Sequence, residues 1–305
     1  MTAVKPRRAR RVQLSVPGSS EKMMRKAAGS NADHVFLDLE DAVAPNAKKA
    51  ARGQIVEALR GLDWTGKVRC VRINDLRTRY AYDDIIEVVK GAGEVLDTIM
   101  IPKVMDARDI HFVETLLSQL ELDLGLKDQI GIEALIEEVH GMKNVDRIAE
   151  SSPRLEALIF GMGDYSASQK MDARSVGGTT GYPGDLWHYA RYRMIIAARA
   201  NDLDPVDGPY SDFRNDEIYR EECRRALILG CVGKWAIHPA QIPIALEVFV
   251  PPADQVAHAR KMIEAYKIAE AQGLGAIQVD GEMVDAASVR ILQNTLDRAL
   301  VGHSR

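Results

Sequence analysis

Short apolar segments alternate with longer helical patterns along almost the whole of this 305-residue chain. Eight of these segments have the length and the apolar content of buried strands. They lie at residues 12–16, 34–39, 67–73, 97–101, 130–136, 156–160, 205–207 and 234–237. Eight strands that alternate with helices over about 240 residues predict an α/β fold, a (β/α)8 TIM barrel. A doubly wound open sheet is the alternative.

The intervals between these strands carry apolar residues three and four positions apart, as amphipathic helices do. The clearest patterns cover Lys48–Leu59, Ala81–Lys90, Ala107–Glu121, Met142–Ala149, Leu186–Ala200 and Asn215–Leu229. Asp106 and Asp216 precede or open two of them, as capping residues would.

The chain continues beyond the eighth predicted strand. Helical patterns cover Pro239–Val248 and Ala253–Gln272, a hairpin or turn is expected at Val279–Met283, and a last helix at Ala286–Leu300. We therefore expect a TIM-barrel catalytic domain over residues 1–274, with a flexible basic arm at residues 1–11. Residues 275–305 would form a C-terminal helical lid that packs on a neighbouring subunit.

Composition excludes several classes of function. The net charge of −4 gives no nucleic-acid footprint. The basic stretch Lys5–Arg11 reads as a solvated arm, with an RNA-binding or targeting role as the alternative. No stretch is apolar enough to span a membrane. The three cysteines, Cys70, Cys223 and Cys231, form no CxxC pair and indicate a reduced, cytoplasmic protein.

Two predicted strands run into carboxylates at the end where barrel enzymes have their active sites. The fifth ends at Glu137, and the sixth runs through Gly161 and Gly163 to Asp164. A bound cation relieves the crowding of such charges most simply, and two carboxylates suit Mg²⁺. No His–His–carboxylate set lies beside them, which disfavours zinc and non-haem iron. The alternative is that Glu137 favours a helix dipole and Asp164 caps the next helix.

Arg72 ends the third predicted strand, among buried-looking residues. A guanidinium that points inward near carboxylates can stabilise a developing enolate or carboxylate. A structural salt bridge to Glu40 or Asp41 is the alternative, and the two roles are compatible. Asp38 and Glu40 share one strand face, which we expect to meet Arg72 or the waters of a metal ion.

The segment that follows the first strand carries cations. Lys22, Arg25 and Lys26 come shortly after Pro17-Gly18-Ser19-Ser20 and could meet phosphates or simply face solvent. The glycine-rich run at residues 175–184 could close over a substrate or be an ordinary surface loop.

Nine motifs carry a resemblance to a known family. They are Ser15–Gly18, Asp38–Val43, Val71–Asn74, Ile101–Lys103, Leu135–Glu137, Ile159–Tyr165, Pro205–Pro209, Gly233–Pro239 and Gly281–Asp285. In this order they resemble the citrate lyase beta-subunit-like branch of the HpcH/HpaI aldolases, most closely its members that cleave malyl-CoA.

The resemblance implies a Mg²⁺-dependent barrel, with Mn²⁺ as an acceptable replacement, whose metal ligands are Glu137 and Asp164. Arg72 would steady the enolate oxygen of a thioester, with the nearby acids Glu40 and Asp41 in the same catalytic group. Asp285 would be the general acid/base and would reach the mouth of a neighbouring subunit. Coenzyme A would be bordered by Ser15, Pro17, Lys22, Arg25, Lys26, Ile237, His238 and Pro239.

The implied reaction is the reversible cleavage of a 3-hydroxyacyl-CoA, such as malyl-CoA, into acetyl-CoA and glyoxylate. A malyl-CoA thioesterase and a citramalyl-CoA lyase are the alternatives within the family. A catalytically silent assembly subunit and a metal-free phosphate-binding barrel are alternatives of other classes. The resemblance also implies small-molecule partners, no nucleic acid or membrane, and a homo-oligomer, either a trimer or a hexamer.

Overall fold

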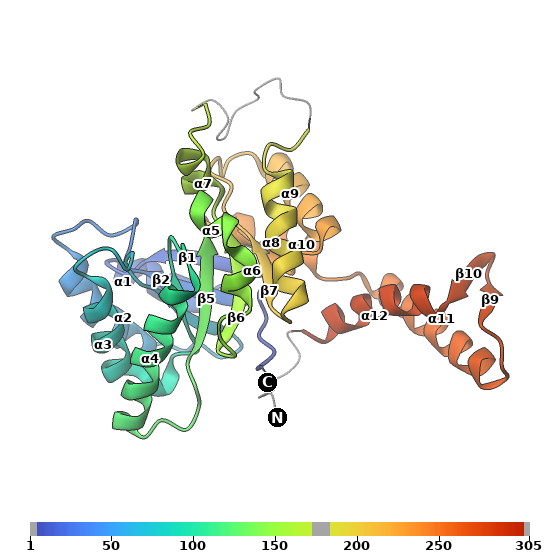
Figure 1. Cartoon of the computed structure of the whole chain (residues 1–305), viewed down its shortest axis with the longest axis horizontal. Helices are drawn as coiled ribbons and strands as arrows, with labels where there is room; N and C mark the ends of the chain where they lie inside the picture. Colours follow the sequence, from blue (N-terminus) through green and yellow to red (C-terminus); the bar gives the residue numbers. More distant parts are fainter. Residues whose placement is uncertain (1–4, 173–183, 302–305) are drawn as a thin grey trace. The chain divides into compact units, whose positions relative to one another are not determined.

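A computed structural model describes residues 5–172 and 184–301 of the chain. It divides into two compact units, Met1–Leu246 and Glu247–Arg305. In the first unit eight parallel strands close into a barrel, in the order in which they occur along the chain (Figure 1). They are β1 (Val12–Pro17), β2 (His34–Asp38), β3 (Val68–Arg72), β4 (Thr98–Ile101), β5 (Gly131–Ile136), β6 (Leu155–Phe160), β7 (Asp204–Asp207) and β8 (Gly233–Ala236). The predicted (β/α)8 barrel is confirmed.

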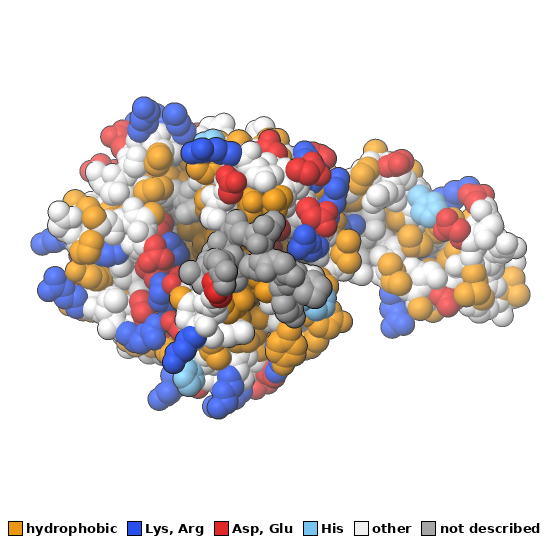
Figure 2. Space-filling view, turned by 90° about the horizontal axis from the view of Figure 1, so that it is seen from above, with side chains coloured by type: hydrophobic (Ala, Val, Ile, Leu, Met, Phe, Trp, Pro, Cys, Tyr) orange, Lys and Arg blue, Asp and Glu red, His pale blue; other side chains and the backbone are white. Residues whose placement is uncertain are grey.

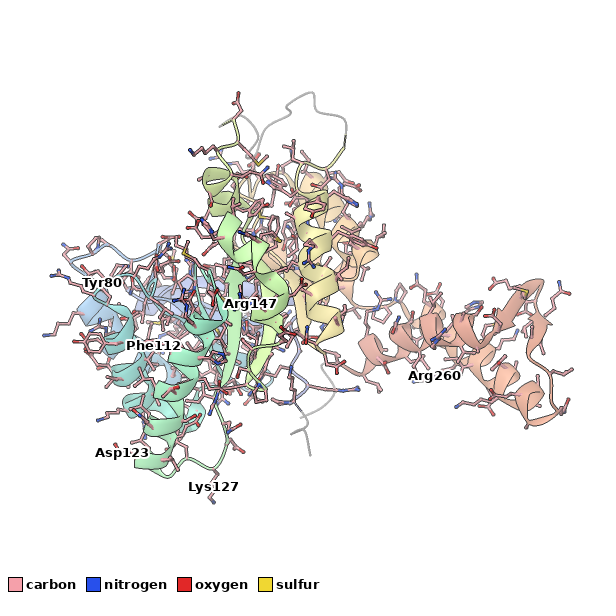
Figure 3. The ribbon with its side chains drawn as sticks, viewed as in Figure 1. Tyr80, Phe112, Asp123, Lys127, Arg147 and Arg260 are labelled. Carbon is pink, nitrogen blue, oxygen red and sulfur yellow. The ribbon has the colours of Figure 1, made fainter. Side chains whose placement is uncertain are left out.

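Helices follow the strands along the chain and surround the barrel (Figure 1). They are α1 (Glu21–Ala28), α2 (Lys48–Gly61), α3 (Ala81–Ala92) with the short 3-10 helix Gly93–Val95, α4 (Ala107–Leu124), α5 (Val139–Lys143), α6 (Val145–Ala149), α7 (Met162–Ser168), α8 (His188–Ala200), α9 (Asp216–Leu229) and α10 (Gln241–Phe249). In Figure 3, Asp123 marks the far end of α4, and Lys127 lies in the loop that returns to β5.

One predicted helix is wrong in part. The pattern at Met142–Ala149 predicts a continuous helix, but the structure has α5 and α6 with a break at Asn144. The side-chain amide of Asn144 donates to the carbonyl of Met105 at 2.9 Å, so this residue is held by a contact outside the helix. Among the described helices, none is long and apolar enough to cross a membrane.

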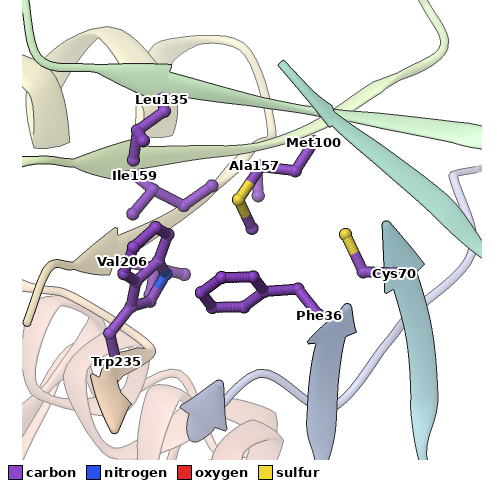
Figure 4. Packing of buried hydrophobic residues seen from close by; sticks show 8 residues of the cluster. All are labelled: Phe36, Cys70, Met100, Leu135, Ala157, Ile159, Val206 and Trp235. Carbon is purple, nitrogen blue, oxygen red and sulfur yellow. The ribbon is translucent and has the colours of Figure 1, made fainter. Parts of the chain in front are cut away.

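An apolar layer fills the middle of the barrel. Every strand but β1 contributes a residue to it. Alternate residues of a strand point to the same side, so these residues all face the interior of the barrel. Its members are Phe36, Cys70, Met100, Leu135, Ala157, Ile159, Val206 and Trp235 (Figure 4). The rings of Phe36 and Trp235 lie 4.4 Å apart between centroids. A ligand bound at the mouth of the barrel would lie above this apolar layer.

A buried ion network closes the other end of the barrel. The guanidinium of Arg10, 1% exposed, contacts Glu133 at 3.0 Å, Glu156 at 2.5 Å and Asp204 at 2.9 Å. Arg8 forms ion pairs with Asp97 and with the same Glu156, and Arg11 forms one with Asp33. Residues 8–11 are therefore fixed by ion pairs, which corrects the expectation of a flexible arm over this part of residues 1–11.

Arg10 is expected to be important for stability. Replacing it with methionine leaves three acids without their shared cation, and breaking a buried ion pair in this way costs about 3–5 kcal/mol. We expect Arg10→Met to lower the free energy of unfolding by about 3 kcal/mol in urea denaturation followed by circular dichroism. The exposed Arg7 supplies the control, because Arg7→Met removes the same charge from the surface. Equal stability of the two variants would contradict the role given to Arg10.

The C-terminal unit is a helical hairpin with a small sheet. It contains α11 (Ala253–Ala271), the antiparallel strands β9 (Ala276–Val279) and β10 (Glu282–Asp285), and α12 (Ala286–Leu300). Asp280 and Gly281 form the two-residue turn, both at positive φ, so the predicted hairpin is confirmed.

The boundary between the units differs from the predicted one. The sequence places it at 274/275, whereas the compact units meet at 246/247. The reason is that α11 carries Met262 and Tyr266, which pack on Val284 of β10. This helix therefore shares its core with the C-terminal segment.

Candidate active site

The candidate site lies next to the apolar layer, on the side of the carboxyl ends of the strands. Asp38, Arg72 and Glu137 each follow a residue of that layer by two positions, and alternation along a strand therefore points them into the mouth of the barrel. Figure 2 shows the protein from above, and acidic and basic side chains lie next to one another on this face of the barrel unit.

Arg72 is held by a two-pronged contact with Asp38. Its Nε donates to Asp38 Oδ1 and its Nη2 to Asp38 Oδ2, both at 2.7 Å. Register explains the meeting, because Asp38 and Arg72 are paired positions of β2 and β3. Burial alone raises the pKa of Asp38, but the charge and hydrogen bonds of Arg72 hold it below its ordinary value. Arg72 is thus a fixed, permanent cation.

Arg72 also reaches the acids that follow Asp38. Its Nη1 lies 2.9 Å from Glu40 Oε2 and 3.9 Å from Asp41 Oδ2. The 2.9 Å contact lacks hydrogen-bond geometry, so Glu40 Oε2 is a buried oxygen with no hydrogen-bond donor among the described residues. Burial raises the pKa of Glu40, and the charge of Arg72 opposes this. The salt bridge expected from the sequence is therefore present.

Glu137 is a deeply buried acid of the mouth, at 3% exposed. Its Oε1 accepts a hydrogen bond from the backbone N–H of Lys103 at 2.9 Å. Burial, followed by repulsion from Glu40, raises the pKa of Glu137 to about 8, against the charges of Arg72 and Lys103. Glu138, its neighbour in sequence, instead contacts Ser168 and faces Arg77.

Asp164 stands in the first turn of α7, on the next strand–helix connection. Its Oδ2 lies 3.6 Å from the Nζ of Lys103, and its side chain is 43% exposed. The glycine that precedes α7 has a specific function: a Cβ on Gly161 would lie 2.5 Å from Glu137 Oε2. The absence of a side chain at Gly161 therefore leaves room for the carboxylate of Glu137.

Lys103 is a site residue to which sequence reasoning gave no role. Its Nζ donates to Glu40 Oε1 at 2.5 Å and lies 3.7 Å from Asp41 Oδ2. Burial alone lowers the pKa of Lys103, but the hydrogen bond and charge of Glu40 raise it above its ordinary value. Its position in the sequence could have identified Lys103 as a site residue, because Pro102-Lys103 directly follows β4 at the same end of the barrel as the acids.

A polar pocket opens beside this cluster. Its lining includes Glu40, Asp41 and Lys103 of the cluster, together with Lys48, Asn74, Asp75, Thr78 and Tyr80. Tyr80, labelled in Figure 3, precedes α3. The pocket adjoins the acids directly, so a small polar ligand bound there would lie next to them.

The donors around Glu137 and Asp164 fit a hard divalent cation. All are oxygens of acids, one of them is a buried oxygen without a hydrogen-bond donor, and the burial of Glu137 opposes its negative charge. Across residues 5–172 and 184–301, the one group of three close metal-ligating side chains is His34, Cys70 and Glu133, inside the barrel. Glu133 there is already bound by Arg10, so the guanidinium supplies the positive charge.

The residues predicted to border coenzyme A lie on β1, on α1 and directly after β8. Strand β1 pairs with β8 up to Leu14 and Ala236, so Ser15 and Ile237 each directly follow a paired position. Ser15 and Pro17 belong to β1 and are half-buried, while Lys22, Arg25 and Lys26 are exposed on α1. The ring of His238 stacks on Phe213 at 4.6 Å between centroids, a contact that was not anticipated.

Asp285 belongs to the other compact unit. It ends β10 and caps α12, where its carboxylate accepts hydrogen bonds from the N–H and the hydroxyl of Ser288, both at 2.8 Å. These bonds lower the pKa of Asp285. The glycine-rich run at 175–184 lies, except for Gly184, outside the described residues.

Comparison with known proteins identifies the family. The model of the HpcH/HpaI aldolase/citrate lyase family matches residues 11–239. An L-malyl-CoA/beta-methylmalyl-CoA lyase of Cereibacter sphaeroides is 42% identical over 93% of this chain and 93% of its own. A (3S)-malyl-CoA thioesterase of the same species is 34% identical over 94% and 93%.

A solved structure extends the likeness. The CitE protein of Mycobacterium tuberculosis, crystallised with magnesium, acetoacetate and coenzyme A, has 27% sequence identity to this chain and a TM-score of 0.74, with 98% and 99% of the two chains covered. The sequence-based prediction of a carbon–carbon lyase agrees with the names of the family and of the lyase relative. The chain belongs to the HpcH/HpaI aldolase/citrate lyase family.

Proposed function

We propose that this protein is a Mg²⁺-dependent carbon–carbon lyase that cleaves malyl-CoA reversibly into acetyl-CoA and glyoxylate. The observation that carries the proposal is the meeting of Glu137, Asp164 and Arg72 at one mouth of the barrel. The 42% identity to a malyl-CoA lyase and the magnesium and coenzyme A of the solved relative support it.

Glu137 and Asp164 would hold the metal ion. Both offer carboxylate oxygens at the mouth, and Mg²⁺ is commonly bound by one or two carboxylates together with water and substrate oxygens. When bound, the ion polarises the oxygens of the substrate and orients the bond to be broken. Mn²⁺, which prefers the same ligands, is proposed as a replacement.

Residues of the protein would stabilise the negative charge that develops in the reaction and transfer the proton. In cleavage the hydroxyl group of the substrate becomes the carbonyl of glyoxylate, and the electrons of the broken bond pass to the acetyl group. Arg72, fixed by Asp38 and flanked by Glu40 and Asp41, stabilises the negative charge on the thioester oxygen. The proton of the hydroxyl group is released to solvent and Asp285 protonates the carbon; in condensation Asp285 removes a proton from the methyl group of acetyl-CoA.

Asp285 acts at the mouth of a neighbouring subunit in this proposal, which makes the enzyme a homo-oligomer, a trimer or a hexamer. Coenzyme A lies along β1 and β8, and Lys22, Arg25 and Lys26 of α1 supply positive charge for its phosphates. We place the enzyme in the cytoplasm, in keeping with its three free, buried cysteines.

The test is an assay of the purified protein with malyl-CoA and Mg²⁺, in which phenylhydrazine traps glyoxylate. We expect glyoxylate and acetyl-CoA in equal amounts, and loss of turnover when EDTA removes the metal. Free CoA without glyoxylate would identify a thioesterase, and no turnover would favour a silent subunit. Condensation of acetyl-CoA with pyruvate in place of glyoxylate tests the citramalyl-CoA alternative.

Gly161 provides a test of the metal site that needs no substrate. The Cβ of Gly161→Ala would displace the carboxylate of Glu137, so Mg²⁺ should bind about 10- to 100-fold more weakly in isothermal titration calorimetry. Gly163→Ala is the matched control, because its Cβ meets no atom within 4 Å. Unchanged affinity in Gly161→Ala would argue against Glu137 as a ligand.

A further inference from the structure

Four acids of the mouth converge on one residue, Lys103. Its Nζ lies 2.5 Å from Glu40, 3.6 Å from Asp164 and 3.7 Å from Asp41, while its backbone N–H donates to Glu137 at 2.9 Å. Both proposed metal ligands therefore depend on Lys103, one through the ammonium and one through the main chain.

The backbone of Lys103 is unusual for a lysine. Its φ of 51° lies in the left-handed region, which a residue with a Cβ adopts at an energetic cost. This conformation lets the N–H bond Glu137 while the side chain, 17% exposed, reaches Glu40. Such strain persists where the surroundings fix it, often at functional sites.

We propose that Lys103 is a positioning residue that serves as the resident counter-cation of this acid cluster. In the metal-free protein its ammonium holds Glu40 and Asp164 in place. When a divalent ion arrives, the same ammonium repels it, so the ion binds weakly and exchanges readily. This inference rests on the proposed function, because it takes Glu137 and Asp164 as the metal ligands.

The electrostatic reason is the short distance between the two cations. An ion bound by Asp164 comes within a few ångströms of an ammonium that is only 3.6 Å from that carboxylate. At such separations a like charge at a partly exposed site changes an affinity by about tenfold. Removing the ammonium should therefore strengthen metal binding and weaken the metal-free fold, two effects of opposite direction.

The experiment compares the full-length wild type with Lys103→Met and Lys103→Arg, stripped of metal with EDTA. Titration with MgCl₂ or MnCl₂ alone gives the affinity, and thermal melting gives the Tm with and without the ion. We expect Lys103→Met to bind Mg²⁺ about tenfold more tightly, with a lower metal-free Tm and a larger rise on adding Mg²⁺. Lys103→Arg keeps the charge and should stay within about threefold of the wild type.

Lys90→Met is the control for the loss of a surface lysine, because Lys90 is exposed in the last turn of α3. Equal or weaker Mg²⁺ binding by Lys103→Met would overturn the inference, and so would a change of the same size in Lys90→Met. If Lys103→Met does not fold without metal, Lys103→Gln replaces it under the same criteria. A wild type that binds neither Mg²⁺ nor Mn²⁺ would overturn the proposed metal site as well. The wild-type titration therefore distinguishes failure of the metal site from failure of the role given to Lys103.

Discussion

Replacing Asp164 with asparagine is expected to reduce the Mg²⁺-dependent cleavage of malyl-CoA by about 1,000-fold. The change keeps the shape of the side chain but removes the charge that would bind the ion. Because the side chain of Asp164 is 43% exposed, the substitution creates no cavity, and the fold should remain intact. Steady-state turnover at saturating Mg²⁺, together with circular dichroism, measures the two effects separately.

The matched control for Asp164→Asn is Asp123→Asn, the same change at an exposed position in the last turn of α4 (Figure 3). We expect Asp123→Asn to keep the turnover of the wild type. Full activity in Asp164→Asn would remove Asp164 from the metal site, and loss of the fold in that variant would instead reveal a structural role for its contact with Lys103.

Asp285→Asn is expected to retain the binding of CoA ligands while losing at least about 100-fold in the exchange of acetyl-CoA methyl protons with solvent deuterium. Asparagine caps a helix as well as aspartate does, so α12 should keep its N-terminus. The change thus removes the base and spares the cap. Proton exchange followed by NMR measures the effect, and persistent exchange would mean that another group is the base.

Asp280→Asn is the matched control in the same unit, because Asp280 stands in the turn between β9 and β10, where asparagine is well tolerated at positive φ. Co-expression of Asp164→Asn with Asp285→Asn then tests whether Asp285 acts on a neighbour. A mixed oligomer would contain mouths with an intact Asp164 from one subunit and an intact Asp285 from another. Recovered activity supports action between subunits; no recovery would place Asp285 at the mouth of its own chain.

Much of the fold could be predicted because its signals are local. Most of the eight strands are compact apolar runs bounded by loops, whereas the short β7, Asp204–Asp207, was expected from its place in the alternation of strands and helices. The unit boundary was misplaced because α11 looks like one more barrel helix in sequence. What assigns it to the C-terminal unit is the packing of Met262 and Tyr266 on Val284, a contact that no local pattern reveals.

The site was predictable to the extent that barrel topology brings strand ends together. Arg72, Glu40 and Asp41 were expected to meet, and they do. Lys103 was missed because a lysine after a strand usually faces solvent, and its contacts depend on a left-handed backbone. The position of Arg10 was equally hidden, since a basic stretch near a terminus resembles a solvated arm, whereas its acid partners are far apart in sequence.

The apolar layer across the middle of the barrel has an electrostatic consequence for how ligands arrive. The guanidinium of Arg72 lies 5.8 Å from the centre of the Phe36 ring and 5.6 Å from that of Trp235. The charges of the mouth are therefore adjacent to an apolar layer of low polarisability. Field lines avoid such a medium and leave through the solvent instead. We therefore expect the charges of the mouth to act on diffusing ions over a longer range than the same charges on an open surface would, and dissolved salt to weaken this long-range effect first.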